Sequence, residues 1–533
     1  MARASTLESL RAAARSPRVG AVALQSFSSG MPLGLVWIAL PAWLAYRHVD
    51  IKTIGYFSLA QAPWNFKFLW APLMDRFSLP WLGRKRSWIV LCQLLLALGT
   101  AGLALEGSAP SVGAVAALAT FIAFASASQD IAIDAYAVEI LEKDEQGLAV
   151  GARIAVYRLA MYTTGALALT LGALWGWAWV FVGQALLFLP MVVVAVRSPE
   201  PERPPSPPHS LRAAVWEPLV SVFQMDRALE ILAFVLLYKL GENLATALTR
   251  PFLIERGFTP ADVGVATATL GLAATLIGTF AGGFLTERIG LGRCLWLSGL
   301  LQAVGCLGYA FVDRLGGPAP GGGLFDLHRL AMYGAVSAEA AFQGMAAGAL
   351  GVLLLRLTSR SFSATQFALF SSIFALGRVL VGPLAGILVD ALGWSTFFVF
   401  TVAASVPGLA LLARFAPLGA REPILGPGEV GRKAPLGRPA LAVFTALGFV
   451  LGSLFALGSV ALLGAARQLR TARPPAAMAG LGGLTLARLA AFASAASAKD
   501  LLALAGPVVF GLVCALGTAA LLTVRRGPRA DDR

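Results

Sequence analysis

In the stretch Gln129-Asp130-Ile131-Ala132-Ile133-Asp134-Ala135, two carboxylates stand near the end of a largely apolar segment that runs from Ser111 to Leu141. Ionised side chains are costly inside a membrane and usually mark a function. Asp130 and Asp134 are four residues apart, so on a helix they share one face, which must turn toward protein or water and not toward lipid. The stretch therefore predicts a helix bundle that encloses a polar path.

The composition of the chain is that of a membrane protein. Its 533 residues are 57% hydrophobic and only 13% charged, and the mean hydropathy is +0.75, which predicts an all-α polytopic membrane protein and not a soluble enzyme. The formal net charge of +14 comes mostly from Arg and Lys in short connections and tails, so we expect no nucleic-acid partner. The four cysteines lack metal-type spacing, and we expect neither a metal site nor a disulfide framework.

Apolar segments close to the length that spans a bilayer recur along the chain. We expect about twelve spans, at residues 20–45, 53–74, 87–106, 111–141, 150–173, 177–197, 228–254, 261–285, 294–312, 328–355, 362–389 and 394–414. Arg76, Arg84, Lys85 and Arg86 follow the second segment, whereas the connections after the third and fifth hold no Lys or Arg. Because positive charge favours the cytoplasmic side, the even-numbered connections and the N-terminus are predicted to be cytoplasmic, with the first segment as an uncleaved anchor.

Proline-rich stretches divide the chain. The run at 199–208 can form neither helix nor strand, and it lies in a predicted cytoplasmic linker at 198–226 between two six-helix bundles, 1–197 and 227–416. A second linker at 417–438 precedes residues 439–533, where apolar runs at about 439–466 and 501–524 predict two additional helices.

The connection between these two runs, at 467–499, is basic, although alternation places it outside. Three interpretations remain open: a connection of this size escapes the charge rule, residues 480–498 form an amphipathic surface helix, or one of the runs does not span. The tail after the second run carries Arg525, Arg526 and Arg529, which favours a cytoplasmic C-terminus.

A motif is repeated in the two halves. Ala71-Pro-Leu-Met-Asp75-Arg76 with Gly83-Arg84-Lys85-Arg86 is echoed by Gly283-Phe-Leu-Thr-Glu287-Arg288-Ile-Gly290 with Arg293. Duplicated halves are typical of secondary transporters. The motif resembles the signature of the major facilitator superfamily, and the resemblance implies a latch that holds one face of a cavity shut, formed by Asp75, Arg76, Gly83, Arg84, Glu287, Arg288 and Arg293. The alternative is that these residues supply topological charge alone.

Further motifs are spread over about residues 18 to 415. They are Phe66-Lys67-Phe68-Leu69-Trp70-Ala71-Pro72, Gln129-Asp130-Ile131, Tyr157-Arg158-Leu159-Ala160-Met161, Tyr238-Lys239-Leu240-Gly241-Glu242 and Phe362-Ser363-Ala364-Thr365-Gln366, with Gly377-Arg378 and Gly382-Pro383. In combination they resemble the AmpG muropeptide permease family. The acetyl-coenzyme A transporter family shares the lysine-tryptophan and glutamine-aspartate motifs. Transport of another organic anion such as acetyl-coenzyme A therefore stays as the alternative.

The AmpG resemblance implies a monomeric transporter with the major facilitator fold in the bacterial inner membrane. It implies proton-coupled import of GlcNAc-anhydro-muropeptide-like fragments for cell-wall recycling, with the proton gradient in place of a cofactor. A membrane-embedded enzyme is less expected, because the chain shows no catalytic cluster at an interface. A sensor is less expected because no connection is long enough for an output domain.

Depth in the membrane, at about 1.5 Å per helical residue, sorts the charged side chains. Lys239, Glu242 and Glu339 are predicted near the midplane and are interpreted as functional. Asp134 and Arg158 lie almost symmetrically about the connection near Gln146, so we expect a structural ion pair between them. Arg378 falls in the outer half of its helix, where its fork suits a substrate carboxylate, and Lys67 lies near the inner end of its own helix.

Proton coupling needs a group that changes charge. His48, His209 and His328 all fall in connections or at helix ends, so the candidates are carboxylates. We expect Asp130, Glu242 and Glu339 to be the candidates, with Lys239 one turn from Glu242 to keep it ionised. The substrate-binding candidates are Gln61, Trp64, Asn65, Lys67, Gln129, Asn243, Gln343 and Arg378, with Trp64 as a surface on which a sugar could stack.

Overall fold

The computed structural model describes residues 15–50, 57–107, 110–201, 206–225, 227–318, 323 and 326–425, and, further along, 442–454, 457–458, 461, 483–486, 515 and 518–519. Within these ranges the chain is helical and forms no strand. Ten helices of this described part are long and apolar enough to cross a membrane. The prediction of an all-α multi-pass membrane protein is confirmed.

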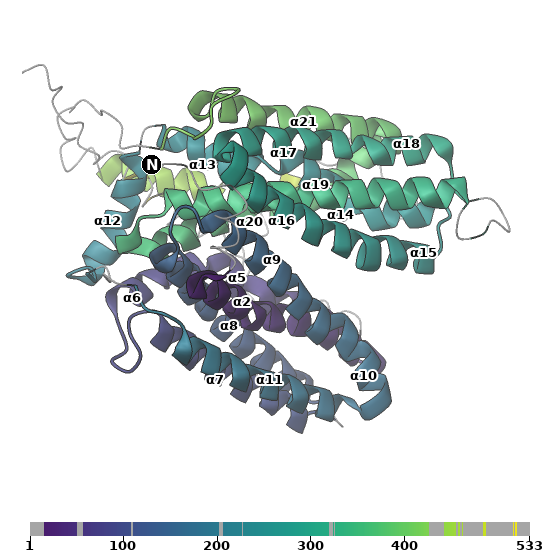
Figure 1. Ribbon diagram of the computed structural model, residues 1–533. Coiled ribbons are helices and arrows are strands. Elements are labelled where there is room, and N and C mark those ends of the chain that lie inside the picture. Colours follow the sequence, from purple (N-terminus) through teal and green to yellow (C-terminus); the bar gives the residue numbers. More distant parts are fainter. Residues whose placement is uncertain are drawn as a thin grey trace, which may run out of the picture.

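Two helix bundles lie beside each other, and they meet closely at one end and diverge toward the other (Figure 1). The first bundle contains α2 (Pro17–Gly34), η1 (Leu35–Ala39), α3 (Leu40–Tyr46), η2 (Phe57–Gln61), α5 (Ala62–Phe66), η3 (Lys67–Leu69), α6 (Ala71–Arg76), α7 (Arg86–Leu105), α8 (Val112–Ile140), α9 (Gln146–Tyr162), η4 (Thr163–Leu167), α10 (Ala168–Trp175) and α11 (Trp177–Arg197). The second contains α13 (Ala228–Leu237), α14 (Leu240–Glu255), α15 (Pro260–Gly264), η5 (Val265–Leu270), α16 (Gly271–Ile289), α17 (Leu291–Gly305), α18 (Leu307–Leu315), α19 (Leu327–Leu357), η6 (Arg360–Phe362), α20 (Ser363–Leu392) and α21 (Trp394–Phe415).

The predicted segments coincide with these helices, except that three of them are broken. One is the segment expected at 294–312, which is divided at Cys306 into α17 and α18. The segment expected at 53–74 is divided into η2, α5, η3 and α6, and its residues 51–56 lie outside the described part. Pro63 and Pro72 stand in the first turns of α5 and α6, where proline has no N–H to continue a preceding helix. The segment expected at 228–254 breaks at Lys239, which precedes α14 with non-helical backbone angles (φ −106°, ψ 17°).

Three of the described spans contain a π-helical segment: η1, η4 and η5. Such segments are rare in helices and frequently occur at functional sites. They turn additional side chains toward the space between the bundles, since Ile38, Ala166 and Thr267 all line the cavity described below.

The helices that carry the site are fixed by close backbone contacts. A Cβ atom on Gly30 of α2 would lie 2.2 Å from the carbonyl oxygen of Tyr157 on α9. A Cβ on Gly278 of α16 would lie 1.9 Å from the carbonyl oxygen of Ala341 on α19. Only glycine permits these approaches, so α9 and α19 are each held firmly within their own bundle.

One helix was not predicted. The connection at 198–226 contains α12 (Leu211–Phe223), whose first turn is capped by the Ser210 hydroxyl, 3.1 Å from the backbone nitrogen of Ala213. Ala214, Pro218 and Val222 are its buried residues, and their spacing of four places them on one face. That face packs against both α6 and α20, so α12 lies across the junction of the bundles.

The predicted C-terminal elements lie mostly outside the described residues. This holds for most of the linker at 417–438, most of the basic connection at 467–499 and nearly all of the run at 501–524, whereas residues 442–454, 457–458 and 461 of the run at 439–466 are described. The described stretch Ala442–Leu454 is a short apolar helix.

Candidate functional site

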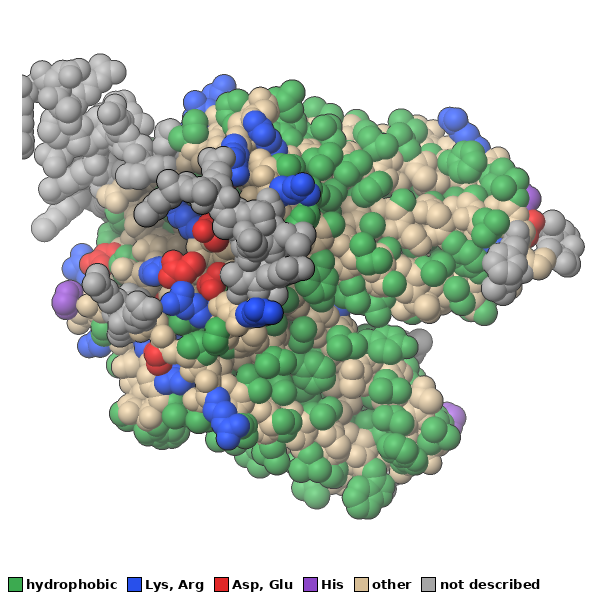
Figure 2. Space-filling view, in the orientation of Figure 1, with side chains coloured by type: hydrophobic (Ala, Val, Ile, Leu, Met, Phe, Trp, Pro, Cys, Tyr) green, Lys and Arg blue, Asp and Glu red, His purple; other side chains and the backbone are tan. Residues whose placement is uncertain are grey.

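The end at which the bundles meet is rich in charge. Figure 2 shows Lys, Arg, Asp and Glu side chains gathered there, at the left of the view, whereas the sides of the molecule are largely hydrophobic. The surface is notched between the bundles toward the opposite end. We call these the charged end and the open end.

Asp75 lies at the centre of the charged end and is fully buried. Its carboxylate accepts hydrogen bonds from Lys85 Nζ (2.8 Å) and Arg84 Nη2 (3.3 Å) of its own bundle. It also accepts from the second bundle: Oδ2 lies 2.8 Å from both the backbone nitrogen and the hydroxyl of Thr365, and Oδ1 lies 3.2 Å from the backbone nitrogen of Ala364. These backbone N–H groups belong to the first turn of α20, where backbone N–H groups have no carbonyl partner within their own helix. A carboxylate of one bundle therefore caps a helix of the other.

Glu139 extends the same junction. It accepts a hydrogen bond from the Ser363 hydroxyl at 2.5 Å and lies 3.6 Å from Arg84 and 3.7 Å from Lys85. All of these side chains are buried. Two carboxylates and two cations of the first bundle thus close around the start of α20.

A second junction is built from the repeated motif. Glu287, at the end of α16, accepts a hydrogen bond from the backbone nitrogen of Leu148 at 2.9 Å, in the first turn of α9. The backbones are close here, since a Cβ on Gly147 would lie 2.4 Å from the carbonyl oxygen of Gly283. Each bundle therefore caps one helix of the other, although the Asp75 junction has more hydrogen bonds.

The remaining motif residues lie beside these junctions. The guanidinium of Arg76 lies over the Phe77 ring (5.5 Å) and that of Arg288 over the Phe284 ring (5.9 Å), so neither reaches the other bundle by these contacts. Arg293 donates to the carbonyl of Gly419 at 2.9 Å. Gly83 and Gly290 have φ of +92° and +93°, which favours glycine at both turns. Lys85 and Glu139, which are absent from the predicted latch set, contribute to the junction.

The expected ion pair between Asp134 and Arg158 is wrong. Asp134 is instead paired with Lys67 Nζ at 3.2 Å and with the guanidinium of Arg153. Asp134 lies six residues before the end of α8 at Ile140, and Arg153 lies seven residues after the start of α9 at Gln146. The depth of each side chain in the bundle is counted from the end of its own helix. By that count Arg153 is level with Asp134, whereas Arg158 lies five residues further along α9.

We expect Asp134 and Arg153 to be energetically coupled. Asp134→Ala leaves two cations unpaired in the bundle, which should cost about 3–5 kcal/mol. A double-mutant cycle of Asp134→Ala with Arg153→Ala, read from thermal unfolding of the purified protein in detergent, should show the double change to be milder than the sum of the singles. The cycle with Arg158→Ala is the control and should be additive; coupling to Arg158 as large as that to Arg153 would refute this pairing.

Other candidates of the first bundle lie around this set. Ser29 donates a hydrogen bond to Asp130, and Gln129, which is fully buried, donates to the Ser28 hydroxyl at 2.7 Å. Trp64 donates to the Ser126 hydroxyl at 3.2 Å, and its ring meets Trp37 edge to face. Asn65 is exposed and Gln61 is half-buried. The geometry thus gives Gln129 and Lys67 partners inside the bundle.

In the second bundle, Lys239 pairs with Glu242 at 2.9 Å, as their spacing predicts. The Gln343 amide donates to Glu242 at 2.6 Å, and Asn243 beside it is buried. Glu339 has a different environment. Its Oε2 lies 3.3 Å from the hydroxyl of Tyr309, and its Oε1 has no hydrogen-bond partner in the described part of the chain.

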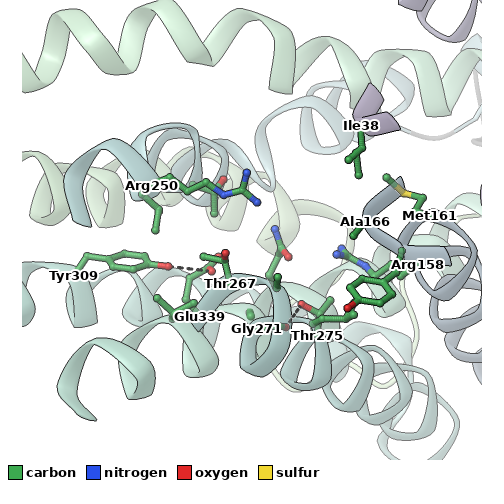
Figure 3. A pocket seen from close by; sticks show the side chains of 18 residues that line it. Ile38, Arg158, Met161, Ala166, Arg250, Thr267, Gly271, Thr275, Tyr309 and Glu339 are labelled. Atoms are coloured by element: carbon green, nitrogen blue, oxygen red, sulfur yellow. Dashed lines mark hydrogen bonds between the residues drawn. The ribbon is translucent and has the colours of Figure 1, made fainter. Parts of the chain in front are cut away.

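A cavity of about 540 Å³ lies between the bundles. Residues of both bundles line it, as Figure 3 shows. The first bundle supplies Ile38, Arg158, Met161, Tyr162 and Ala166, and the second supplies Thr246, Thr249, Arg250, Thr267, Ala268, Gly271, Leu272, Thr275, Tyr309, Val336, Glu339, Ala340 and Gln343. At the charged end the two capping junctions join the bundles. This is the arrangement expected of a carrier whose site is reached from one side.

Comparison with known proteins agrees with this geometry. Residues 22–319 match the family described as the Major Facilitator Superfamily. The chain is 42% identical over 398 residues to the anhydromuropeptide permease of Escherichia coli (strain K12), across 74% of this chain and 79% of that protein. The chain belongs to the AmpG-type transporters of the Major Facilitator Superfamily. It is also 34% identical to an uncharacterised protein of Haemophilus influenzae, across 74% of this chain and 94% of that protein.

A solved structure supports the fold of this AmpG-type transporter. The Escherichia coli fucose:proton symporter matches with a TM-score of 0.56 and 13% identity, across 74% of this chain and 98% of that chain. This structure confirms the major facilitator fold, and the family match with the 42% identical relative confirms the resemblance to AmpG and the assignment as a transporter and not an enzyme.

The cavity of this AmpG-type transporter contains a residue that was missed from the sequence. Arg250 lies on α14, eight residues after Glu242 and hence about two turns along the same face. That spacing could have identified it. Arg158, predicted as structural, lines the same cavity, whereas Arg378, predicted to bind substrate, is exposed and is not among the residues that line it.

Proposed function

We propose that this transporter imports anhydro-muropeptides across the bacterial inner membrane, coupled to protons, by alternating access. The relative that is 42% identical is named an anhydromuropeptide permease. The observation that carries the proposal is a cavity shared by both bundles, which the capping junctions join at the charged end. We infer that the charged end faces the cytoplasm, that both termini lie on that side, and that the chain acts as a monomer.

Glu339 is the proposed proton carrier. It is buried and lines the cavity, and one of its oxygens lacks a hydrogen-bond partner among the described residues. Glu242 is held by Lys239 and Gln343, and Asp130 accepts from Ser29. A carboxylate that faces the cavity with few fixed partners can gain and lose a proton with the least disturbance of its surroundings.

The two capping junctions are the proposed latch. In alternating access the charged end must open, and this breaks the bonds from Asp75 to α20 and from Glu287 to α9. The N–H groups that lose their cap then become available to water, so each break is reversible. The latch thus supports closure at the cytoplasmic side without permanent links between the bundles.

The sugar and peptide parts of the substrate would contact different residues, and of the predicted binding residues only Gln343 is among those that line the described cavity. Trp64, with Asn65 and Gln61 nearby, remains the proposed surface for a sugar ring, and Gln343, which lines the cavity, can donate or accept hydrogen bonds. Arg378 is the proposed partner of a carboxylate. The guanidinium of Arg378 would also suit another organic anion such as acetyl-coenzyme A.

Uptake by purified protein in liposomes tests this function. With an inward proton gradient, we expect saturable accumulation of a labelled anhydro-muropeptide, loss of accumulation when a protonophore removes the gradient, and competition by unlabelled anhydro-muropeptide but not by acetyl-coenzyme A. The reverse order of competition would transfer the function to the alternative. Uptake that neither saturates nor depends on the gradient would argue for a channel.

A further inference from the structure

We propose that Arg158 and Arg250 form a two-sided site for a carboxylate of the substrate, and that this carboxylate draws the bundles together at the open end. The proposal rests on the proposed function and names the chemical group that the cavity recognises. It concerns two residues that belong to different bundles, Arg158 on α9 and Arg250 on α14.

The charges around the cavity do not balance. In the first bundle Asp134 is paired with Lys67 and Arg153, and in the second Glu242 is paired with Lys239. Counted with Asp130, the first set holds two carboxylates and two cations, and the second holds one of each, so neither set leaves an unpaired carboxylate for the cavity lining. Among the residues that line the cavity, the charged ones are Arg158, Arg250 and Glu339. The lining therefore has an excess of positive charge, and protonation of Glu339 would increase it.

Both arginines are available to a ligand. Within the described residues neither Arg158 nor Arg250 makes a hydrogen bond or an ion pair to another side chain. Arg250 is exposed, and Arg158 is half-buried. Figure 3 shows their guanidinium groups extending into the cavity from opposite sides, with Glu339 and Tyr309 further along the wall that carries Arg250. An anion between them would accept charge-assisted hydrogen bonds from both bundles.

The base of each arginine is fixed. Tyr157, the neighbour of Arg158, is in backbone contact with Gly30, where a Cβ would lie 2.2 Å from its carbonyl oxygen. Arg250 lies on α14, where the adjacent Thr249 donates a hydrogen bond to the carbonyl of Ala245 at 3.0 Å and Thr246, one turn earlier, donates to the carbonyl of Glu242 at 2.9 Å. The guanidinium groups can therefore move mainly by motion of the bundles that carry them.

A carboxylate suits this pair for a physical reason. Each guanidinium can bind a carboxylate with two parallel hydrogen bonds, and a single carboxylate has enough lone pairs to accept from both sides. With no anion present, two like charges that face each other favour separation of the bundles. An anion between the two arginines attracts both of them and so replaces repulsion with attraction. The anion therefore binds more tightly when the bundles are close together than when they are apart, and this difference in binding free energy is what coupling requires.

The test compares two substrates in four proteins, with Arg250→Lys as a fifth protein that tests partial rescue. The substrates are the anhydro-muropeptide and the same compound with its peptide carboxylates converted to carboxamides. The proteins are the parent, Arg250→Gln, Arg158→Gln and Arg314→Gln, in which an exposed arginine of α18 outside the cavity lining is removed as the control for general attraction of anions. Uptake in proteoliposomes gives KM for each pair.

We expect the parent and Arg314→Gln to prefer the carboxylate form by about tenfold or more in KM, the scale of a lost charge-assisted bidentate contact. Arg250→Gln and Arg158→Gln should lose that preference while keeping the KM of the carboxamide form, and Arg250→Lys should recover part of it. An unchanged preference in both Gln variants would overturn the proposal. So would equal losses for both substrates, which would indicate a structural role.

A separate measurement keeps this result apart from the proposed function. If the parent fails to transport anhydro-muropeptide, the proposed function fails, and the carboxylate site is then judged by thermal unfolding of the purified protein with a free peptide that carries the carboxylates and with its carboxamide form. Stabilisation of the parent that is lost in Arg250→Gln and Arg158→Gln supports the site. No stabilisation by either compound refutes it.

Discussion

Replacement of Glu339 by glutamine should abolish gradient-driven accumulation and leave substrate binding and exchange between equal compartments intact. Gln keeps the size of the side chain and can still accept a hydrogen bond from Tyr309, which lies 3.3 Å from Glu339 Oε2. It cannot carry a proton. In proteoliposomes the internal concentration of labelled substrate should therefore rise only to the external one, whatever the imposed proton gradient.

Glu242→Gln is the matched control for this prediction. It removes a carboxylate of the same bundle, but one that is paired with Lys239 at 2.9 Å, so the expected result is reduced amounts of folded protein or weakened binding, not uncoupled exchange. If Glu339 only positions the substrate, the Glu339→Gln variant will bind substrate more weakly, and the pH dependence of its remaining transport will match that of the parent. Full gradient-driven uptake with unaltered affinity would remove Glu339 from the mechanism.

Replacement of Asp75 by asparagine should open the charged end. The change removes the charge that holds Lys85 and Arg84 and weakens the cap on α20, contacts to charged groups that contribute about 1.5–3 kcal/mol each. We expect uptake to fall by about tenfold or more while the protein stays in the membrane. Thr275→Cys, in a chain with its native cysteines replaced, should then react faster with a membrane-impermeant thiol reagent supplied from the charged end.

Glu287→Gln gives the comparison, because Glu287 accepts from the backbone of Leu148 in the other bundle, whereas Asp75 accepts three hydrogen bonds from α20. Its effect on uptake and labelling should be smaller than that of Asp75→Asn. Normal uptake by a normally expressed Asp75→Asn variant would leave the motif with a role in topology alone.

Much of the fold follows from local properties of the sequence. The segment expected at 111–141 forms α8 at Val112–Ile140, because the thickness of the bilayer sets the length of an apolar helix. The pairing of Lys239 with Glu242 was also predictable, since residues one turn apart on a helix are neighbours. These predictions need no knowledge of how the bundles meet.

Contacts between helices were harder to predict. The pairing of Asp134 depends on where α8 ends and α9 begins, and an error of a few residues moved its partner from Arg153 to Arg158. The bond between Asp75 and Thr365 joins residues 290 positions apart, and no periodicity connects them. Arg250 was missed because an arginine close to the end of a span resembles a topological charge until the opposite bundle is in place.

The Asp75 junction also has a consequence for the biogenesis of the transporter. The chain is synthesised from its N-terminus, so Lys85, 10 residues from Asp75, is made long before Thr365. Lys85 can therefore hold the Asp75 carboxylate as an ion pair while the first bundle inserts. The carboxylate is then already in place to accept hydrogen bonds from the first turn of α20. The contact that α20 completes is thus among the last to form during membrane assembly, and it is among the first that the working transporter must break.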